Sequence, residues 1–314
     1  MGNNAIKPTP VSTPTPTLTS TWPAAPRVFW TYWQHLPVPT VVTACTTSWQ
    51  RHHPDFVVQV VTRADLGSLL FGDVGADIDT YLRTHFAWLD CPARESDLVR
   101  LLLLAKFGGV WLDASILLAE PLKFFEAVVS PDPSLAHVHF AGFHLRGWNT
   151  KPQWPVLENW AWACRPGSPF TAAWLQEFLS IPNVPDGTAL KLRQYQSAGV
   201  DTQGIEGVHY LLMHVAAQHL LQGSATHAAG MALVCAEEGP YKYLVDVGWN
   251  SQVAVKSLLA SFPRGRGVFK LRSIERGLVS EPDARRLLAA VKSGVVGESW
   301  GQGESESGVR GRSE

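Results

Sequence analysis

Two short runs of β-branched and aromatic residues, separated by one helix-length segment, open the folded part of this chain. The runs are residues 27–33 and 56–61, and residues 38–51 between them fit a helix that starts near Pro39. A strand, a helix and a second strand in this order predict two parallel strands joined by a crossover helix. Ligands of such sheets collect at the carboxyl ends of the strands, so we expect a functional site at that edge.

The composition predicts one large domain with a flexible segment at each end. Of the 314 residues, 46% are hydrophobic and 17% are charged. The charged share is below the roughly 25% of an average soluble domain, which indicates a large buried core. Residues 1–25 are rich in Thr and Pro, and residues 294–314 in Gly, Ser and Glu, so both are predicted to be disordered. A single folded domain is expected over residues 26–293.

Charge and hydropathy exclude several classes of partner. The 26 Lys and Arg residues balance 27 Asp and Glu residues and form no block, which argues against nucleic acid as a partner. The most apolar window, residues 98–118, contains Arg100, Lys106 and Asp113, so it is not a transmembrane segment. There is no signal-peptide pattern. We therefore expect a cytoplasmic protein, either free or peripheral to a membrane.

The four cysteines point to the same compartment. They are widely spaced, with no C-x-x-C pair and no histidine at zinc spacing: Cys45, Cys91, Cys164 and Cys235. This spacing predicts buried free thiols in a reducing environment rather than a zinc site or a disulfide framework.

The most informative segment lies in the first half of the chain. A helix is predicted over residues 97–107, with Gly108 as its end, followed by a short strand that ends at Asp113. Asp97 and Arg100 are three residues apart and share one face of this helix. Taken alone, the pair fits an ordinary ion pair of the first turn, and Asp113 fits a turn residue.

In this order, these elements resemble the sugar-nucleotide motif of family 32 glycosyltransferases and, more closely, that of bacterial capsular polysaccharide synthesis proteins. The motif reads SD-x-x-R, then GG-[IV]-[WY]-x-D-x-[DST], and it matches residues 96–100 and 108–115. The resemblance spans about residues 27–275 and implies a GT-A fold, a Rossmann-like mixed sheet flanked by helices. Its weaker matches are residues 27–30, 47–49, 53–56, 158–160, 168–170 and 269–271.

The resemblance implies a glycosyltransferase that moves a sugar from a nucleotide-diphosphate-sugar donor to a glycan such as a capsular polysaccharide, with retention of configuration. It also implies Mn²⁺ or Mg²⁺, held by Asp113 and Ser115, to stabilise the diphosphate leaving group. Ser115 stands where the family often has a second Asp, which leaves one carboxylate. We therefore expect cation binding to depend on donor binding.

The resemblance assigns catalytic roles to Asp113, Asp97 and Arg100. Asp97 would accept hydrogen bonds from sugar or ribose hydroxyls, and Arg100 would hold Asp97 or a donor oxygen. The donor-binding residues that it implies are Trp30, Asp97, Arg100, Gly109 and Lys270.

Some of these assignments have a plain structural alternative. Trp30 would stack on the nucleobase or would simply be a core residue. Lys270 would neutralise the diphosphate or would be an ordinary exposed lysine. Glu158 and Trp160 are expected to line an acceptor groove, although half of an alternating strand points into the core.

Two other functions are compatible with parts of the sequence. A non-catalytic sugar or sugar-nucleotide binding protein would tolerate Ser115, and the absence of donor hydrolysis would identify it. Residues 297–301 fit the G-x-S-x-G pattern of serine hydrolases, but no core strand precedes them and no helix follows. We therefore reject the hydrolase interpretation.

Overall fold

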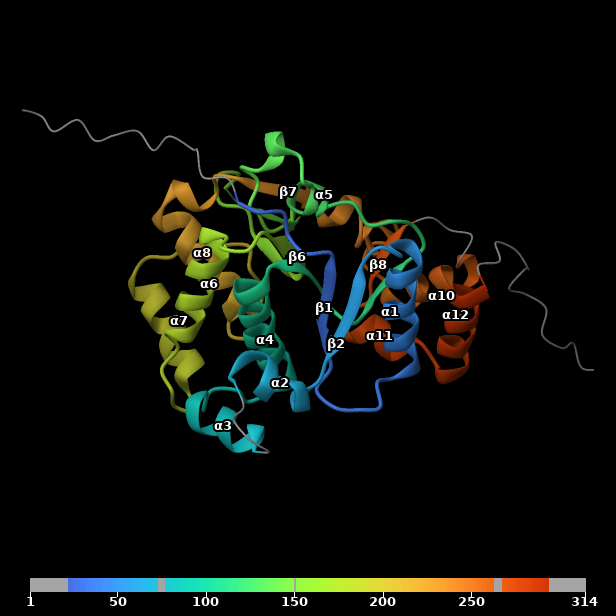
Figure 1. Ribbon diagram of the computed structural model, residues 1–314, viewed down its shortest axis with the longest axis horizontal. Helices are drawn as coiled ribbons and strands as arrows, with labels where there is room; N and C mark the ends of the chain where they lie inside the picture. Colours follow the sequence, from blue (N-terminus) through green and yellow to red (C-terminus); the bar gives the residue numbers. More distant parts are fainter. Residues whose placement is uncertain (1–21, 73–76, 150, 263–266, 294–314) are drawn as a thin grey trace, which may run out of the picture.

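The computed structural model describes residues 22–72, 77–149, 151–262 and 267–293. Its centre is a six-stranded sheet in the order β2-β1-β3-β6-β5-β7. The strands are β1 (Val28–Tyr32), β2 (Val57–Val61), β3 (Gly109–Leu112), β5 (Phe140–His144), β6 (Leu157–Cys164) and β7 (Met231–Cys235). The predicted mixed sheet flanked by helices is confirmed (Figure 1).

The direction of the strands decides which residues meet at one edge of the sheet. β1 pairs in parallel with β2 and β3, whereas β6 pairs antiparallel with both β3 and β5, and β5 is parallel to β7. β6 is therefore the reversed strand of this sheet. Its amino end lies beside the carboxyl ends of β1, β3, β5 and β7.

Helices cover both faces of the sheet. One face packs against α4 (Pro92–Phe107), α6 (Pro169–Leu179) and α8 (Leu212–Gly223), with α7 (Gly187–Ser197) outside them (Figure 1). Because both faces are covered, all four residues of β3 are buried. The shorter helices on this side are α2 (Arg63–Leu70) and α3 (Ile78–His85).

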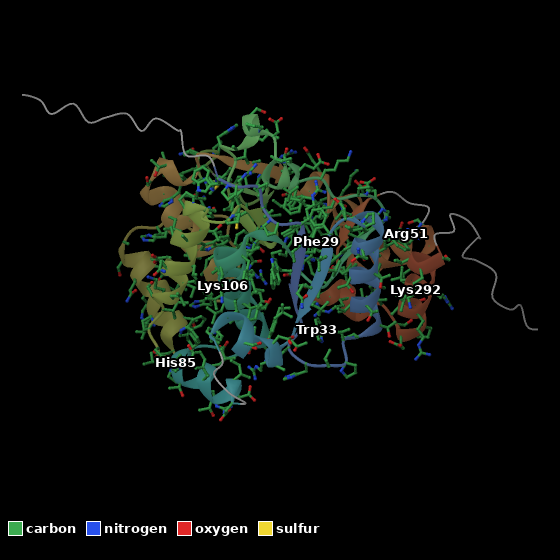
Figure 2. The ribbon with its side chains drawn as sticks, in the orientation of Figure 1. Phe29, Trp33, Arg51, His85, Lys106 and Lys292 are labelled. Atoms are coloured by element: carbon green, nitrogen blue, oxygen red, sulfur yellow. The ribbon has the colours of Figure 1, made fainter. Side chains whose placement is uncertain are left out.

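The other side carries a second, two-stranded sheet. β4 (Ile116–Leu118) pairs antiparallel with β8 (Val268–Lys270), and Ile116 lies opposite Lys270. α1 (Thr40–His52) packs between this sheet and α12 (Glu281–Ser293), where the Arg51 side chain donates a 2.6 Å hydrogen bond to the carbonyl of Val291 (Figure 2). The remaining helices are α5 (Glu126–Val129), α9 (Lys242–Val245), α10 (Ser251–Ser261) and α11 (Ser273–Leu278), with single 3₁₀ turns at Pro133–Leu135, Ala225–His227 and Ala236–Glu238.

The motif helix is longer than the sequence predicted. α4 begins at Pro92, five residues before the predicted start, because proline at a first helical position needs no amide partner. Gly108 ends it with φ +67°, and a Cβ there would lie 2.9 Å from Cδ of Pro166. Only glycine fits this conformation and this space, so the turn from α4 into β3 is fixed.

Part of the predicted leader is packed against the domain. Ala25 is buried, and the ring of Trp22 makes an edge contact with His139 at 5.0 Å between centroids. The folded domain therefore includes residues 22–25 of the predicted leader. The predicted tail and the G-x-S-x-G segment lie outside the described residues.

The cysteines are free thiols, as predicted, and three of the four are buried. Burial raises the pKa of the Cys45 and Cys164 thiols to about 12, so both stay protonated and unreactive near neutral pH. No helix in the described ranges is long and apolar enough to cross a membrane.

Candidate active site

A cavity of about 1260 Å³ opens at the edge where the carboxyl ends of the strands meet the amino end of β6. Tyr32 and Trp33 border it at the end of β1, Asp113 after β3, and Glu158 and Asn159 at the start of β6. This is the edge at which α/β sheets bind ligands. The volume is sufficient for a nucleotide-sugar together with part of an acceptor.

Asp113 is at the centre of the cavity floor. Its Oδ2 accepts a 2.6 Å hydrogen bond from the Lys270 ammonium, and its Oδ1 lies 3.2 Å from Nη2 of Arg100. The indole of Trp111 donates a 3.0 Å hydrogen bond to the same Oδ1. Burial alone would raise the pKa of Asp113, but Lys270 and Arg100 hold it below its ordinary value, so Asp113 is a carboxylate.

Arg100 is held on several sides. Its Nη1 donates a 2.6 Å hydrogen bond to the carbonyl of Asn159, and its Nη2 donates a 3.0 Å hydrogen bond to the Ser96 hydroxyl. Its guanidinium lies 5.1 Å from the ring centre of Trp111. These contacts fix its orientation toward Asp97 and Asp113.

Asp97 shares one face of α4 with Arg100, as the spacing predicted. Its Oδ1 lies 3.3 Å from Nη1 of Arg100 and accepts a 3.0 Å hydrogen bond from the side-chain amide of Asn159. Burial is the main reason why the pKa of Asp97 rises from 3.8 to about 6. Two neighbouring carboxyl groups thus have pKa values that are shifted in opposite directions, a pattern typical of functional sites.

Lys270 reaches the floor from the distant end of the chain through the pairing of β4 with β8. Only 7% of the residue is exposed, so it is not the ordinary surface lysine that the sequence left open. Its ammonium contacts Asp113 and lies 3.2 Å from the Ser115 hydroxyl, and it faces the ring of Trp160 at 5.8 Å. Burial lowers the pKa of Lys270, against the opposing effect of Asp113.

The two predicted metal ligands both contact the Lys270 ammonium in this arrangement. Asp113 and Ser115 share the Lys270 ammonium, and the second oxygen of Asp113 faces Arg100. Within the described ranges, no three His, Cys, Asp or Glu side chains come together as metal ligands. A divalent cation at Asp113 would share its carboxylate with the Lys270 ammonium and the Arg100 guanidinium.

Glu158 and Trp160 lie at the start of β6, and both border the cavity. The ring of Trp160 is buried and stacks on Phe143, which agrees with the alternative that half of this strand points into the core. Glu158 is buried, and its Oε2 lies 3.6 Å from Nε2 of His214 on α8. His214 also lines the cavity, although the five-residue histidine spacing gave no reason to select it.

Two predicted donor residues are not in the cavity wall. Trp30 stacks on Phe107 in the core and donates a 3.0 Å hydrogen bond to the carbonyl of Gly108. The sequence placed Trp30 at the end of the first strand, but β1 continues to Tyr32, so Trp30 lies inside the sheet. A Cβ at Gly109 would lie 3.0 Å from the Trp30 indole nitrogen, so Gly109 allows close packing of β1 and β3.

The sequence motifs missed an aromatic and basic rim. Trp33 and Trp249 line the cavity, and each faces a guanidinium, Arg276 at 5.6 Å and Arg272 at 5.2 Å. Trp249 has φ +63°, which is unusual for a bulky residue and typical of strained functional positions. Arg272 lies two residues after Lys270, a predicted donor residue, so that position could have pointed to it. No sequence signal identifies Trp249.

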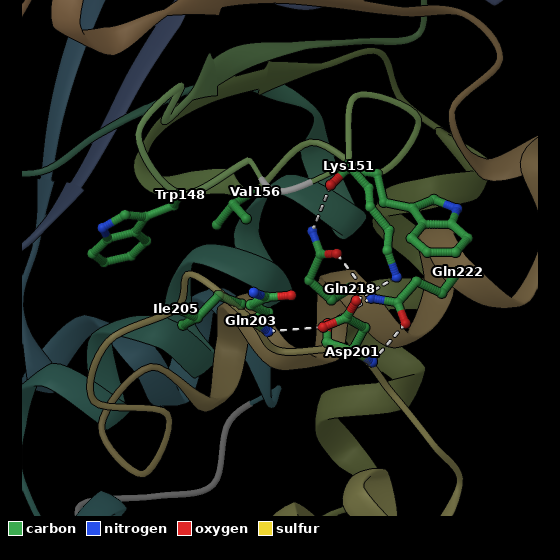
Figure 3. A pocket seen from close by; sticks show the side chains of 9 residues that line it. Trp148, Lys151, Val156, Asp201, Gln203, Ile205, Gln218 and Gln222 are labelled. Atoms are coloured by element: carbon green, nitrogen blue, oxygen red, sulfur yellow. Dashed lines mark hydrogen bonds and ion pairs between the residues drawn. The ribbon is translucent and has the colours of Figure 1, made fainter.

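A second, small cavity lies behind the segment that joins β5 to β6 (Figure 3). Its volume is only about 10 Å³, enough for one water. Lys151 and Asp201 form a 2.5 Å ion pair beside it, and Gln222 donates a 2.7 Å hydrogen bond to the carbonyl of Asp201. Trp148 borders both cavities, so this polar cluster anchors one wall of the large cavity.

Comparison with known proteins supports one family. Residues 18–132 match the family described as capsular polysaccharide synthesis protein. This match confirms the resemblance over the part of the chain that holds Asp97, Arg100 and Asp113. No curated protein matches the chain by sequence.

Three solved structures are similar to the chain at low identity. The PaToxG glycosyltransferase is 16% identical, with 64% of this chain and 80% of that chain covered, at a TM-score of 0.33. The galactosyltransferase LgtC, solved with donor and acceptor sugar analogues, is 12% identical, with 85% and 95% covered, at 0.39. The ligand-free glycosyltransferase domain of the YGT toxin is 10% identical, with 90% and 95% covered, at 0.33.

Proposed function

We propose that the protein is a glycosyltransferase that binds a nucleotide-diphosphate-sugar on the cavity floor and transfers the sugar to a glycan acceptor. The observation that carries this proposal is the buried cluster of Asp97, Arg100, Asp113 and Lys270 on the floor of a cavity of about 1260 Å³. The family match over the first three of these residues supports it. The proposed acceptor is a capsular-polysaccharide-like glycan, and the proposed fold type is GT-A.

Transfer breaks the bond between the anomeric carbon and an oxygen of the diphosphate, which leaves with the bonding electrons. Lys270 and Arg100 supply fixed positive charge where the negative charge develops. Asp113 orients both groups, because its two carboxylate oxygens contact one each. Asp97, when ionised, accepts hydrogen bonds from donor hydroxyls and holds the sugar in place.

We further propose that the acceptor lies against the wall that contains Glu158 and Trp160. The Glu158 carboxylate is suited to accept a proton from the acceptor hydroxyl, and His214 at 3.6 Å orients it. The Trp160 ring is buried, stacks on Phe143 at 5.0 Å between centroids and faces the Lys270 ammonium, so it supports this wall rather than stacking on a sugar ring. Transfer is proposed to retain the anomeric configuration, which NMR of the product would test.

The proposal is tested by measuring nucleoside diphosphate release from a panel of nucleotide-sugars, with and without glycan acceptors. We expect Asp97→Asn to reduce release by at least about 100-fold. The amide has no negative charge to pair with Arg100, and it replaces one acceptor oxygen with a donor. Asp55→Asn is the matched control, since Asp55 pairs with exposed Arg27 at the opposite edge of the sheet. Binding of a nucleotide-sugar without any release would instead support a non-catalytic binding protein.

A further inference from the structure

We propose that the donor diphosphate binds here without a divalent cation, because the Lys270 ammonium occupies the position between Asp113 and Ser115. The inference rests on the proposed function and concerns the charge that neutralises the leaving group. It departs from the metal-dependent site that the motif implies. It follows from which atoms contact which on the cavity floor.

The Lys270 ammonium is bound as a cation would be. It contacts Oδ2 of Asp113 at 2.6 Å and the hydroxyl of Ser115 at 3.2 Å, the two motif positions implied as metal ligands. An ammonium has three N–H donors, and these contacts use two of them within the described part of the chain. The third is available to a phosphate oxygen, because Lys270 lines the cavity.

The backbone around Lys270 is fixed on both sides. Its amide donates a 3.1 Å hydrogen bond to the carbonyl of Pro240, and its carbonyl accepts a 2.8 Å hydrogen bond from the Tyr243 hydroxyl. The next amide, of Leu271, donates a 2.9 Å hydrogen bond to the carbonyl of Ser115. The lysine stem therefore starts from a rigid position and directs its charge to one place.

Electrostatics opposes a metal ion beside this lysine. A divalent cation on Asp113 would lie next to both the ammonium of Lys270 and the guanidinium of Arg100, with a single carboxylate between them. Like charges at such distances repel strongly in a buried site. A diphosphate has the opposite charge, and the Lys270 ammonium lines the cavity and can pair with it, whereas the Arg100 guanidinium is already bound by Asp97, Asp113, Ser96 and Asn159.

The direct test is calorimetric titration of the full-length protein with uridine, guanosine, adenosine and cytidine diphosphates, once in EDTA and once in Mn²⁺. We expect at least one of them to bind with a Kd that differs by less than about threefold between the two conditions. Binding in Mn²⁺ that is lost in EDTA would overturn this inference and leave the proposed function standing. No binding in either condition would overturn both.

A charge-removing variant provides the second measurement. Lys270→Met keeps the aliphatic stem and is expected to weaken nucleoside diphosphate binding in EDTA by at least about tenfold. Lys106→Met is the matched control, because Lys106 is at the opposite end of α4 and donates to the carbonyl of Leu69. Equal binding by wild type and Lys270→Met would contradict the inference. The wild-type comparison remains decisive if Lys270→Met does not fold.

Discussion

At the scale of single residues, the cavity floor is stable because each buried charge has a partner. Asp113 contacts two cations, and Arg100 contacts two carboxylates. Burial of an unpaired charge is costly, so any change to one member alters the others. These residues are close together only because α4, β3 and β8 converge.

Asp113→Asn tests this coupling. The amide keeps the volume but removes the negative charge, so we expect activity to fall by at least about 100-fold and the free energy of unfolding to fall by about 3 kcal/mol. Contacts with Lys270 and Arg100 add the stability cost. Nucleotide release and urea unfolding measure both effects, with Asp55→Asn as control, and near-normal activity would remove Asp113 from the mechanism.

The raised pKa of Asp97 predicts a pH dependence. Because its pKa is about 6 in the folded protein and 3.8 ordinarily, the folded state binds more protons between these values. This group's contribution to stability is therefore full at low pH and is lost as pH rises through about 6. Donor binding should change in the opposite sense, since the ionised carboxylate is the stronger acceptor for donor hydroxyls.

The measurement is the Kd of a nucleotide-sugar between pH 5 and pH 8. We expect affinity to increase through about pH 6 for wild type, and Asp97→Asn to lack this transition. A transition of the same size and midpoint in Asp97→Asn would assign it to another group.

At the scale of elements, local sequence patterns predicted most strands and helices to within a few residues. The apolar patterns of residues 231–235 and 281–292 predict a strand and a helix, and these correspond to β7 and α12. The pattern from residue 206 to 221 also predicts a helix, but that helix begins at Leu212, since residues 206–210 form turns.

The site was predictable where its residues are local and unpredictable where it depends on distant pairing. Asp97, Arg100 and Asp113 lie in one motif and do meet on the floor. The contact of Lys270 with Asp113 crosses 157 positions and depends on the β4–β8 register, which composition and periodicity do not determine. Trp30 was wrongly placed at the cavity because β1 ends two residues later than predicted, at Tyr32. Trp30 therefore lies within the sheet and packs in the core.

Gly204→Ala tests how the cavity wall at Trp148 is held in place. Gly204 has φ +92°, and a Cβ there would lie 2.4 Å from the carbonyl oxygen of Trp148. We expect a loss of about 3 kcal/mol and a rise in the acceptor KM with little change in donor binding. Gly207→Ala is the matched control, because its φ is +71° and nothing lies within 4 Å. Thermal unfolding and kinetics of both variants measure the difference, and equal effects would exclude the contact with Trp148 as the cause.

At the scale of the whole molecule, the domain is a central sheet between two helical layers (Figure 1). The site draws on both sides of the central sheet. α4 packs on one side, and β8 lies on the other side with α1 and α12. Global unfolding and loss of the site should therefore coincide.

Truncation tests where this unit begins. Deleting residues 1–21 is expected to leave the Tm unchanged, because their Thr- and Pro-rich sequence offers little apolar surface. Deleting residues 1–25 should lower the Tm, because it removes the Trp22 contact with His139 and also the buried side chain of Ala25. The two truncations differ by four residues and are compared by calorimetry. Equal melting temperatures would show that Trp22 and Ala25 contribute nothing.

Because β6 runs opposite to its neighbours, the cavity floor and the wall beside β6 are built by different segments of the chain. The floor is built by residues of α4, the end of β3 and β8, whereas the other wall is built by residues that enter β6 and by the anchored segment before it. Insertions or substitutions in that entering segment leave the register of β3 and β8 intact. Under the proposed function, the segment that contacts the acceptor can therefore change in length or sequence without changing the residues that hold the donor.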